Sequence, residues 1–82
     1  MNMKNMHSIL IADDEKHVRN DIIQSMHWSD YGFYIIGEAE NGRQALQMIQ
    51  DLQPDVLITD IKMPFANGLK LIESAHQIKP DI

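Results

Sequence analysis

Three aspartates stand at places in this 82-residue sequence where their side chains could do chemistry together. Asp13 and Asp14 directly follow the apolar run Ser8–Ala12, and Asp60 directly follows the apolar run Val56–Thr59. Hard divalent cations such as Mg²⁺ take oxygen ligands, commonly one or two carboxylates together with substrate phosphate. A carboxylate held beside Mg²⁺ can also attack phosphorus and form an aspartyl phosphate. If the three side chains meet in space, they predict a cation site in which a carboxylate could act as a nucleophile.

Each aspartate also has an ordinary structural explanation. Aspartate is favoured at helix N-termini, and Asp14 is placed to cap a helix that begins near Glu15. Asp60 could simply form a turn, because aspartate is common in turns. Capping explains the joint arrangement less well, because two acids follow one apolar run and a third acid follows another.

The pattern of apolar residues predicts the elements that would position these acids. Short apolar runs at Ser8–Ala12, Phe33–Gly37 and Val56–Thr59 are typical of strands buried on both faces. Apolar residues at helical spacing predict three helices, with faces formed by Val18, Ile22, Ile23 and Met26 (in about Glu15–Met26), by Ala45, Leu46, Ile49 and Leu52, and by Leu71, Ile72, Ala75 and Ile78. Pro54 ends the second helix and Pro80 the third.

The order of strand and helix, repeated three times, predicts an α/β fold with a parallel sheet and right-handed crossovers. In such sheets, ligands bind outside the carboxyl ends of the strands, where the strand order reverses. If the first and third strands are neighbours, Asp13, Asp14 and Asp60 converge at that point. We expect one domain over residues 1–82, with an ordered core over about 8–82 and an N-terminal tail over 1–7.

Composition excludes several classes of function. The 12 acidic residues outnumber the 7 Lys and Arg and give a net charge of −5, which disfavours direct binding of nucleic acid by this segment. Cysteine is absent, which excludes disulfides and thiolate metal sites and fits a cytoplasmic location. No segment approaches the roughly 18–20 apolar residues that would span a membrane. The histidines show no metal-ligand spacing and are expected on the surface; they are His7, His17, His27 and His76.

Two segments resemble the receiver domain of two-component response regulators. Ile11–Glu15 is similar to the family's opening, a hydrophobic strand followed by an acidic pair, and Thr59–Gly68 is similar to its phosphoacceptor segment. The positions that match in the second segment are Asp60, Met63, Pro64, Asn67 and Gly68. The resemblance implies a flavodoxin-like (CheY-like) sheet of strand order 2-1-3-4-5, in which Pro64 and Gly68 shape the loop and the start of the third helix.

The resemblance also implies a role for each acidic residue. Asp60 would accept a phosphoryl group from a sensor histidine kinase, so the chain would be a phosphoacceptor that assists its own phosphorylation and dephosphorylation rather than an enzyme. Asp13 and Asp14 would hold Mg²⁺ with Asp60, directly or through water. The backbone carbonyl of Lys62 would be the remaining protein ligand, which leaves its side chain free to vary.

The loop around Trp28 and the run Gly37–Gly42 look most like receivers joined to AraC-type helix-turn-helix transcription regulators. DNA would then be bound only through a C-terminal domain that this sequence lacks. A whole receiver needs two further strands, which carry a Ser or Thr, a Lys and an aromatic switch residue. Because the chain stops at Ile82, we expect a truncated receiver with impaired phosphorylation. We also expect self-association through the open edge of the third strand or through the third helix.

Two other functions are also compatible with a strand-end aspartate. A haloacid-dehalogenase-like phosphatase also uses a strand-end aspartate and Mg²⁺, but it needs a second acid two residues after the nucleophile. Lys62 occupies that position here, which argues against a phosphatase. A receiver-like docking or dimerisation module that is never phosphorylated would not need the intact set of Asp13, Asp14 and Asp60. Measured Mg²⁺ binding separates this module from a phosphoacceptor.

Overall fold

The computed structural model describes residues 6–63 and 67–82, and strands alternate with helices as expected. The strands are β1 (His7–Ala12), β2 (Phe33–Ala39) and β3 (Val56–Thr59), and the helices are α1 (Lys16–Gln24), the short 3₁₀ helix η2 (Trp28–Tyr31), α2 (Gly42–Leu52) and α3 (Gly68–Ile78). Strand β1 begins at His7, one residue before the expected strand and inside the expected tail. Residues 1–5 of that tail and Pro64 lie outside the described residues.

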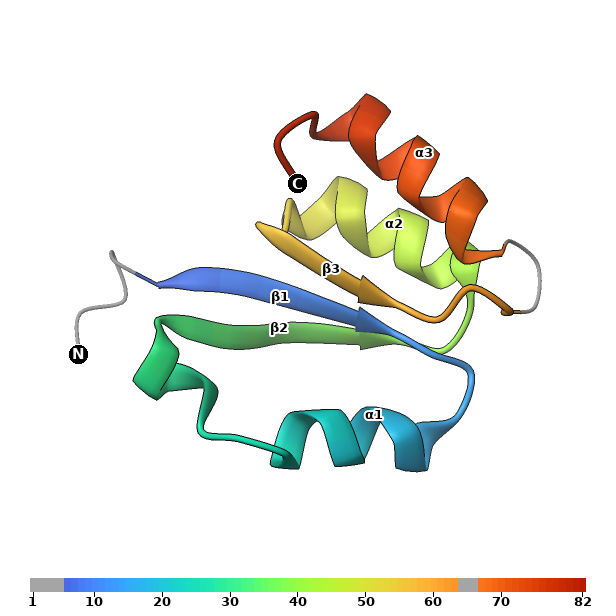
Figure 1. The fold of residues 1–82 in the computed structure, drawn as a ribbon. Coiled ribbons are helices and arrows are strands. Elements are labelled where there is room, and N and C mark those ends of the chain that lie inside the picture. The colour runs from blue at the N-terminus through green and yellow to red at the C-terminus, as the bar shows by residue number, and fades with distance from the viewer. Residues whose placement is uncertain (1–5, 64–66) are drawn as a thin grey trace.

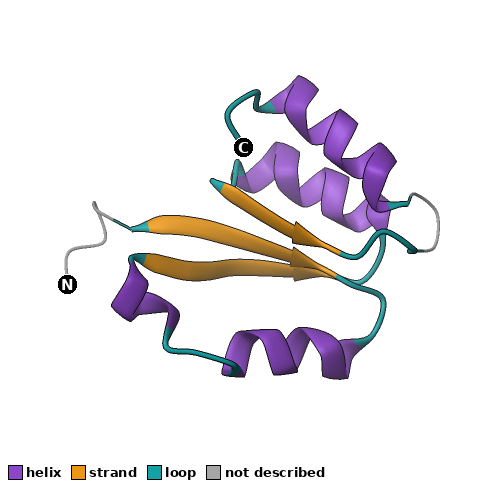
Figure 2. Ribbon diagram, viewed as in Figure 1, coloured by secondary structure: helices purple, strands orange, loops and turns teal. Residues whose placement is uncertain are grey.

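The three strands form one parallel sheet in the order β2-β1-β3. Helix α1 covers one face of the sheet, and α2 and α3 cover the other face (Figure 1). Figure 2 shows the resulting three layers, with the strands between two layers of helix. The parallel α/β arrangement inferred from the sequence is therefore confirmed, and β1 is its central strand.

Burial differs between the central strand and its neighbours. In β1, Ile9, Leu10 and Ile11 are at most 1% exposed, as a strand covered on both faces requires. Leu10 packs with α2 and α3, in a core cluster that comprises Leu10, Ala12, Ala39, Ala45, Ile49, Met63, Leu71 and Ala75. Strand β3 is only partly buried along its length, contrary to the expectation from its apolar sequence. The reason is its position, because within the described residues β3 has a partner strand on one side only.

The start of α1 differs from the sequence-based expectation. The N-cap is Glu15, which makes no side-chain capping bond, and Asp14 is not the cap. The backbone N–H of Glu15 donates instead to the Asp13 carboxylate at 2.9 Å, and the helix starts at Lys16. At the other end, the indole N–H of Trp28 donates to the Ile23 carbonyl at 2.9 Å, so the tryptophan covers the end of this helix.

Asparagine side chains begin both of the other long helices. Asn41 accepts a hydrogen bond from the Gln44 N–H at 2.8 Å at the start of α2. Asn67 does the same for the Lys70 N–H at 2.8 Å at the start of α3. Each bond satisfies a backbone donor that the first turn of a helix leaves unpaired. The part of the chain that the structure describes contains no helix long and apolar enough to cross a membrane.

The amino ends of β1 and β3 are tied together by Asp55. Its carboxylate accepts from the Ser8 backbone N–H at 2.9 Å and from the Lys79 ammonium at 3.1 Å. Lys79 also donates to the Gln53 carbonyl at 2.9 Å, which fastens the end of α3 to the residues before β3. The Ser8 and Lys79 hydrogen bonds lower the pKa of Asp55 below its ordinary value, because they stabilise the ionised carboxylate. His7 lies beside the same carboxylate, with its Nδ1 3.7 Å from an oxygen.

Candidate metal centre

Strand pairing brings the three aspartates together at the carboxyl end of the sheet. Ala12 of β1 pairs with Thr59 of β3, and the N–H of Asp60 donates to the Ala12 carbonyl at 3.0 Å. The residues that follow the paired ones therefore leave the sheet side by side. One carboxylate oxygen from each of Asp13, Asp14 and Asp60 lies within 4.8 Å of the other two. The convergence expected from the sequence is found.

Asp13 is the most firmly held of the three. It is buried, with 9% of its surface exposed. Its backbone N–H donates to the Ala39 carbonyl at 3.0 Å, and one of its carboxylate oxygens accepts from the Glu15 N–H. Asp14 is exposed, which leaves its carboxylate accessible to a cation from solvent.

The Asp60 carboxylate lies beside the main chain of the loop that follows it. One of its oxygens accepts a long hydrogen bond of 3.4 Å from the Lys62 backbone N–H. The Thr59 hydroxyl donates to the Asp60 carbonyl at 2.9 Å and fixes the end of the strand. The side chain of Lys62 is exposed, so it is the main chain of this residue that contacts the cluster.

The loop after Asp60 is anchored at both ends of its described part. Met63 is buried in the core cluster between the sheet and the helices. The Gly68 N–H donates to the Ile61 carbonyl at 2.6 Å, which draws the start of α3 against the end of β3. A Cβ at position 68 would run into the Asp60 carbonyl oxygen and would lie 2.7 Å from the Ile61 Cα. Only glycine fits there, because the opposing atoms are backbone and cannot move aside.

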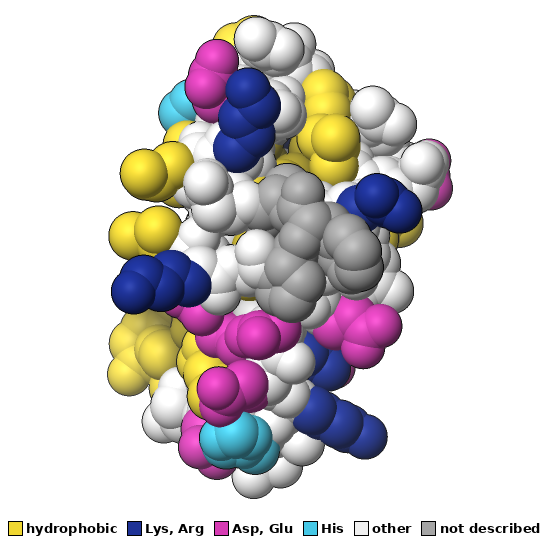
Figure 3. Space-filling view, turned by 90° about the vertical axis from the view of Figure 1, so that its right-hand side faces the viewer, with side chains coloured by type: hydrophobic (Ala, Val, Ile, Leu, Met, Phe, Trp, Pro, Cys, Tyr) yellow, Lys and Arg dark blue, Asp and Glu magenta, His cyan; other side chains and the backbone are white. Residues whose placement is uncertain are grey.

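The donor set suits a hard divalent cation. Two ligands on opposite sides of one Mg²⁺ are about 4.2 Å apart, because each lies about 2.1 Å from the ion. One carboxylate oxygen from each of Asp13, Asp14 and Asp60 lies within 4.8 Å of the other two, so direct or water-bridged contacts to one ion are within reach of all three. Figure 3 looks onto this end of the sheet, where acidic side chains gather on one part of the face. Without a cation, these carboxylates repel one another. Among the described residues, no histidine joins a group of three or more possible metal ligands.

Two residues that the sequence analysis did not single out, Arg19 and Glu38, form hydrogen bonds next to this cluster. Arg19 of α1 is buried, and its guanidinium donates to the Asp13 carbonyl at 2.6 Å. Its Nε also donates to the Glu38 carboxylate at 3.1 Å. The sequence carries no spacing pattern that would have paired them, because Arg19 and Glu38 belong to different elements and meet only in the folded chain.

The comparisons with known proteins agree with this geometry. Residues 9–82 match the family model of the response regulator receiver domain. The chain is 38% identical over 77 residues to the uncharacterized transcriptional regulatory protein YesN of Bacillus subtilis. That alignment covers 94% of this chain and 21% of YesN, so the chain spans about a fifth of the length of this relative.

Two solved structures from AraC-type and related regulators are similar throughout the chain. The receiver domain of AraT, a response regulator from Geobacillus stearothermophilus, has a TM-score of 0.89 and 36% identity, over 93% of this chain and 59% of that chain. A two-component transcriptional regulator AraC from Clostridium phytofermentans has a TM-score of 0.84 and 35% identity, over 90% of this chain and 57% of that chain. Sequence, fold and the converged aspartates agree: the chain belongs to the receiver domains of two-component response regulators.

Proposed function

We propose that Asp60 accepts a phosphoryl group from a sensor histidine kinase. The observation that carries this proposal is the convergence of Asp60 with Asp13 and Asp14 at the ends of two paired strands. An isolated strand-end aspartate would serve as a turn or a cap, whereas three carboxylates in one place repel one another, and a divalent cation would offset that repulsion. That cation is also the group that phosphoryl transfer requires.

The transfer follows from the placement of the Asp60 carboxylate. One of its oxygens attacks the phosphorus of a phosphohistidine on the kinase, the new O–P bond forms as the N–P bond breaks, and the imidazole leaves. The Asp13 and Asp14 carboxylates and the Lys62 carbonyl would hold Mg²⁺ beside the Asp60 carboxylate. When bound, Mg²⁺ offsets the negative charge that develops on the phosphoryl oxygens.

Labelling of the full-length protein with acetyl phosphate tests the proposal. Mass spectrometry should find one phosphoryl group on Asp60 of the wild type and none in Asp60→Asn. The matched control is Asp51→Asn, which changes an exposed aspartate on α2 and should leave labelling intact. Undiminished labelling of the Asp60→Asn variant would exclude this residue as the phosphoacceptor.

We further propose that the 82-residue chain alone is labelled much more slowly than the full-length protein. The resemblance to receivers implies that a Ser or Thr and a Lys, on two strands that would follow this segment, contact the phosphoryl group. Electrostatic contacts of this kind are each worth roughly 10²–10³ in rate. Equal labelling rates for the 82-residue chain and the full-length protein would contradict a contribution of these Ser or Thr and Lys contacts.

The names of the relatives, rather than this chain itself, suggest what kind of domain the receiver controls. YesN is called a transcriptional regulatory protein, and the chain corresponds to about a fifth of it. The similar Clostridium phytofermentans structure is called a two-component transcriptional regulator AraC. We therefore propose that this receiver controls an AraC-type DNA-binding domain, in the cytoplasm, and that DNA contacts are made by that domain.

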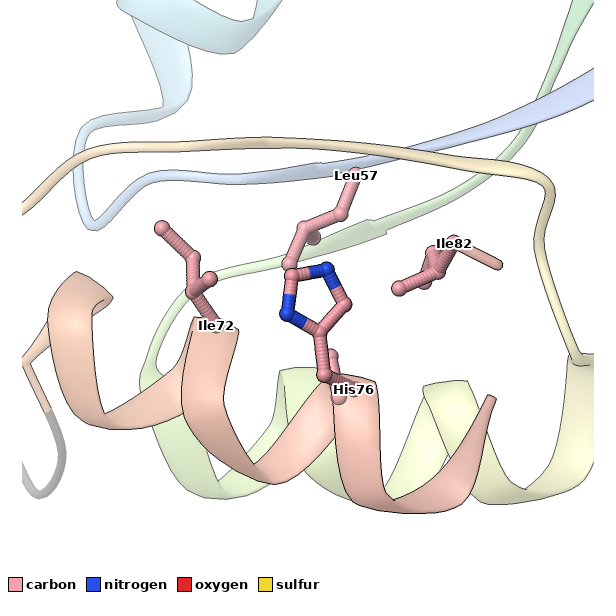
Figure 4. Close-up of a pocket in the computed structure, with 5 residues that line it drawn as sticks. Leu57, Ile72, His76 and Ile82 are labelled. Atoms are coloured by element: carbon pink, nitrogen blue, oxygen red, sulfur yellow. The ribbon is translucent and has the colours of Figure 1, made fainter. Parts of the chain in front are cut away.

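A pocket beside β3 suggests a second property of the 82-residue chain. It has a volume of about 200 Å³ and is lined by Leu57, Ile72, Ala75, His76 and Ile82 (Figure 4). Ile72 is 38% exposed at its border, and within the described residues the outer edge of β3 has no partner strand. Apolar surface next to an unpaired strand edge is a template for pairing with another chain. We propose that two copies of the chain associate through this surface.

Sedimentation of the 82-residue chain at micromolar concentration tests the association. Ile72→Asp places a charge at the pocket and should convert the associated species to monomer. Glu73→Ala is the matched control, because it changes the next, exposed residue of α3 and should leave association unchanged. A wild-type chain that sediments as a monomer would show that this surface does not bind a second copy.

A further inference from the structure

Arg19 is a buried charge whose position needs an explanation. Its side chain is only 11% exposed, and among the described residues of α1 it is the one that is buried. Burying a guanidinium is costly unless hydrogen bonds and an opposite charge compensate it. Two such partners are present, the Asp13 carbonyl at 2.6 Å and the Glu38 carboxylate at 3.1 Å. Arg19 thus links α1 to the end of β1 and to β2.

The bond to Asp13 completes a set of restraints on that residue. Its N–H is held by the Ala39 carbonyl, its carbonyl by Arg19 and one carboxylate oxygen by the Glu15 N–H. Both backbone groups of Asp13 are then engaged, and the bond from Glu15 fixes one of its carboxylate oxygens. The main chain at Asp13 is therefore set in the direction that brings its side chain, and that of Asp14, towards Asp60.

We infer that Arg19 is a positioning residue for the divalent cation, with Glu38 as the group that orients it. This inference rests on the proposed function, because it assumes that the aspartates hold Mg²⁺. Arg19 contacts the backbone of a ligand rather than the cation itself, and Glu38 offsets its positive charge so that it competes less with the cation. Outer partners of metal ligands typically contribute 10–100-fold in metal affinity.

A purely structural Arg19 would have a different signature. If it only fastened α1 to the sheet, its loss would lower the melting temperature and leave the affinity for Mg²⁺ unchanged. Lys79 provides the matched control, because it also pairs with a carboxylate and a backbone carbonyl but at the opposite end of the sheet. Lys79→Met should therefore lower the melting temperature without changing Mg²⁺ binding.

The test is calorimetric titration of Mg²⁺ into the full-length protein and its variants. We expect Arg19→Ala to weaken Mg²⁺ binding by about tenfold or more, and Arg19→Lys to recover part of the loss, because lysine can reach one partner but lacks the planar fork. Glu38→Ala, at a side chain that is 40% exposed, should weaken binding several-fold. If Arg19→Ala does not fold, the affinity of Glu38→Ala for Mg²⁺ decides whether Arg19 has the positioning role.

The outcomes separate this inference from the proposed function. Wild-type affinity in Arg19→Ala, or in Glu38→Ala if the first variant is unfolded, overturns the positioning role while the cation site stands. The positioning role is also overturned if Lys79→Met weakens Mg²⁺ binding as much as Arg19→Ala does. The loss of affinity would then come from the lower stability of the fold. A wild-type protein that binds no Mg²⁺ removes the cation site and this inference with it.

Discussion

Ala12 and Thr59 lie opposite each other in the pairing of β1 with β3, and this register sets the distance between Asp13 and Asp60. The hydrogen bond from the Asp60 N–H to the Ala12 carbonyl closes the pair at 3.0 Å. A shift of one residue in a strand turns every side chain to the other face of the sheet. The acidic cluster therefore depends on the packing of β1, and the chemistry of the site depends on the core beneath it.

Loss of one carboxylate should weaken the proposed cation site directly. We expect Asp13→Asn to lower the affinity for Mg²⁺ by at least about tenfold, because a charged oxygen ligand is replaced by a neutral one. Calorimetric titration measures the change. Asp51→Asn, at an exposed position on α2, is the control and should bind as the wild type does. An Asp13→Asn variant with unchanged affinity would show that this carboxylate is not a ligand.

Replacement of Gly68 by alanine should disturb the loop that carries Asp60. The added Cβ meets the Asp60 carbonyl oxygen and the Ile61 Cα, and neither can move without shifting the backbone of the site. We expect a loss of about 1–3 kcal/mol in the free energy of unfolding, as for other overpacked positions, together with slower labelling of Asp60. Denaturant unfolding and acetyl phosphate labelling measure the two effects. Leu69→Ala, at a side chain that is 63% exposed, should change stability by less than about 0.5 kcal/mol.

Asp55 should make the fold sensitive to acid. Its folded pKa lies below the ordinary value of 3.8, mainly because of the Ser8 N–H and then Lys79. A lowered folded pKa means that ionised Asp55 stabilises the fold above about pH 4 and that this contribution is lost as the pH falls through the folded pKa. We expect Asp55→Asn to be less stable than the wild type at pH 7, with a difference that shrinks in acid. A difference that stays constant from pH 7 to about pH 2 would assign the effect to another group.

The cap of α2 should contribute to stability independently of the cation site. Asn41→Ala removes the acceptor of the Gln44 N–H and should cost about 1 kcal/mol in the free energy of unfolding. Asn41→Ser keeps a side-chain oxygen at the cap and should recover most of that loss. Denaturant unfolding measures both variants. Equal stability of the alanine and serine variants would mean that this hydrogen bond adds nothing.

The sequence by itself determined the order of the elements and the residues at the ends of the strands. The short apolar runs of β1 and β3 and the acids that follow them are local features, and parallel pairing is the usual outcome when helices separate strands. From these features the convergence of Asp13, Asp14 and Asp60 followed on the condition that the first and third strands are neighbours, an order that the resemblance implied and the structure has.

Only the tertiary structure decided which charged groups become partners, because these groups lie far apart in the chain. Asp14 was expected to cap α1, but the Asp13 carboxylate accepts the Glu15 N–H, so Asp14 remains exposed beside the cluster. Arg19 with Glu38, and Lys79 with Asp55, belong to different elements and share no spacing pattern. A polar side chain can satisfy its hydrogen bonds with many partners, and the packing of helices on the sheet selects among them, whereas an apolar run has to be buried in any fold.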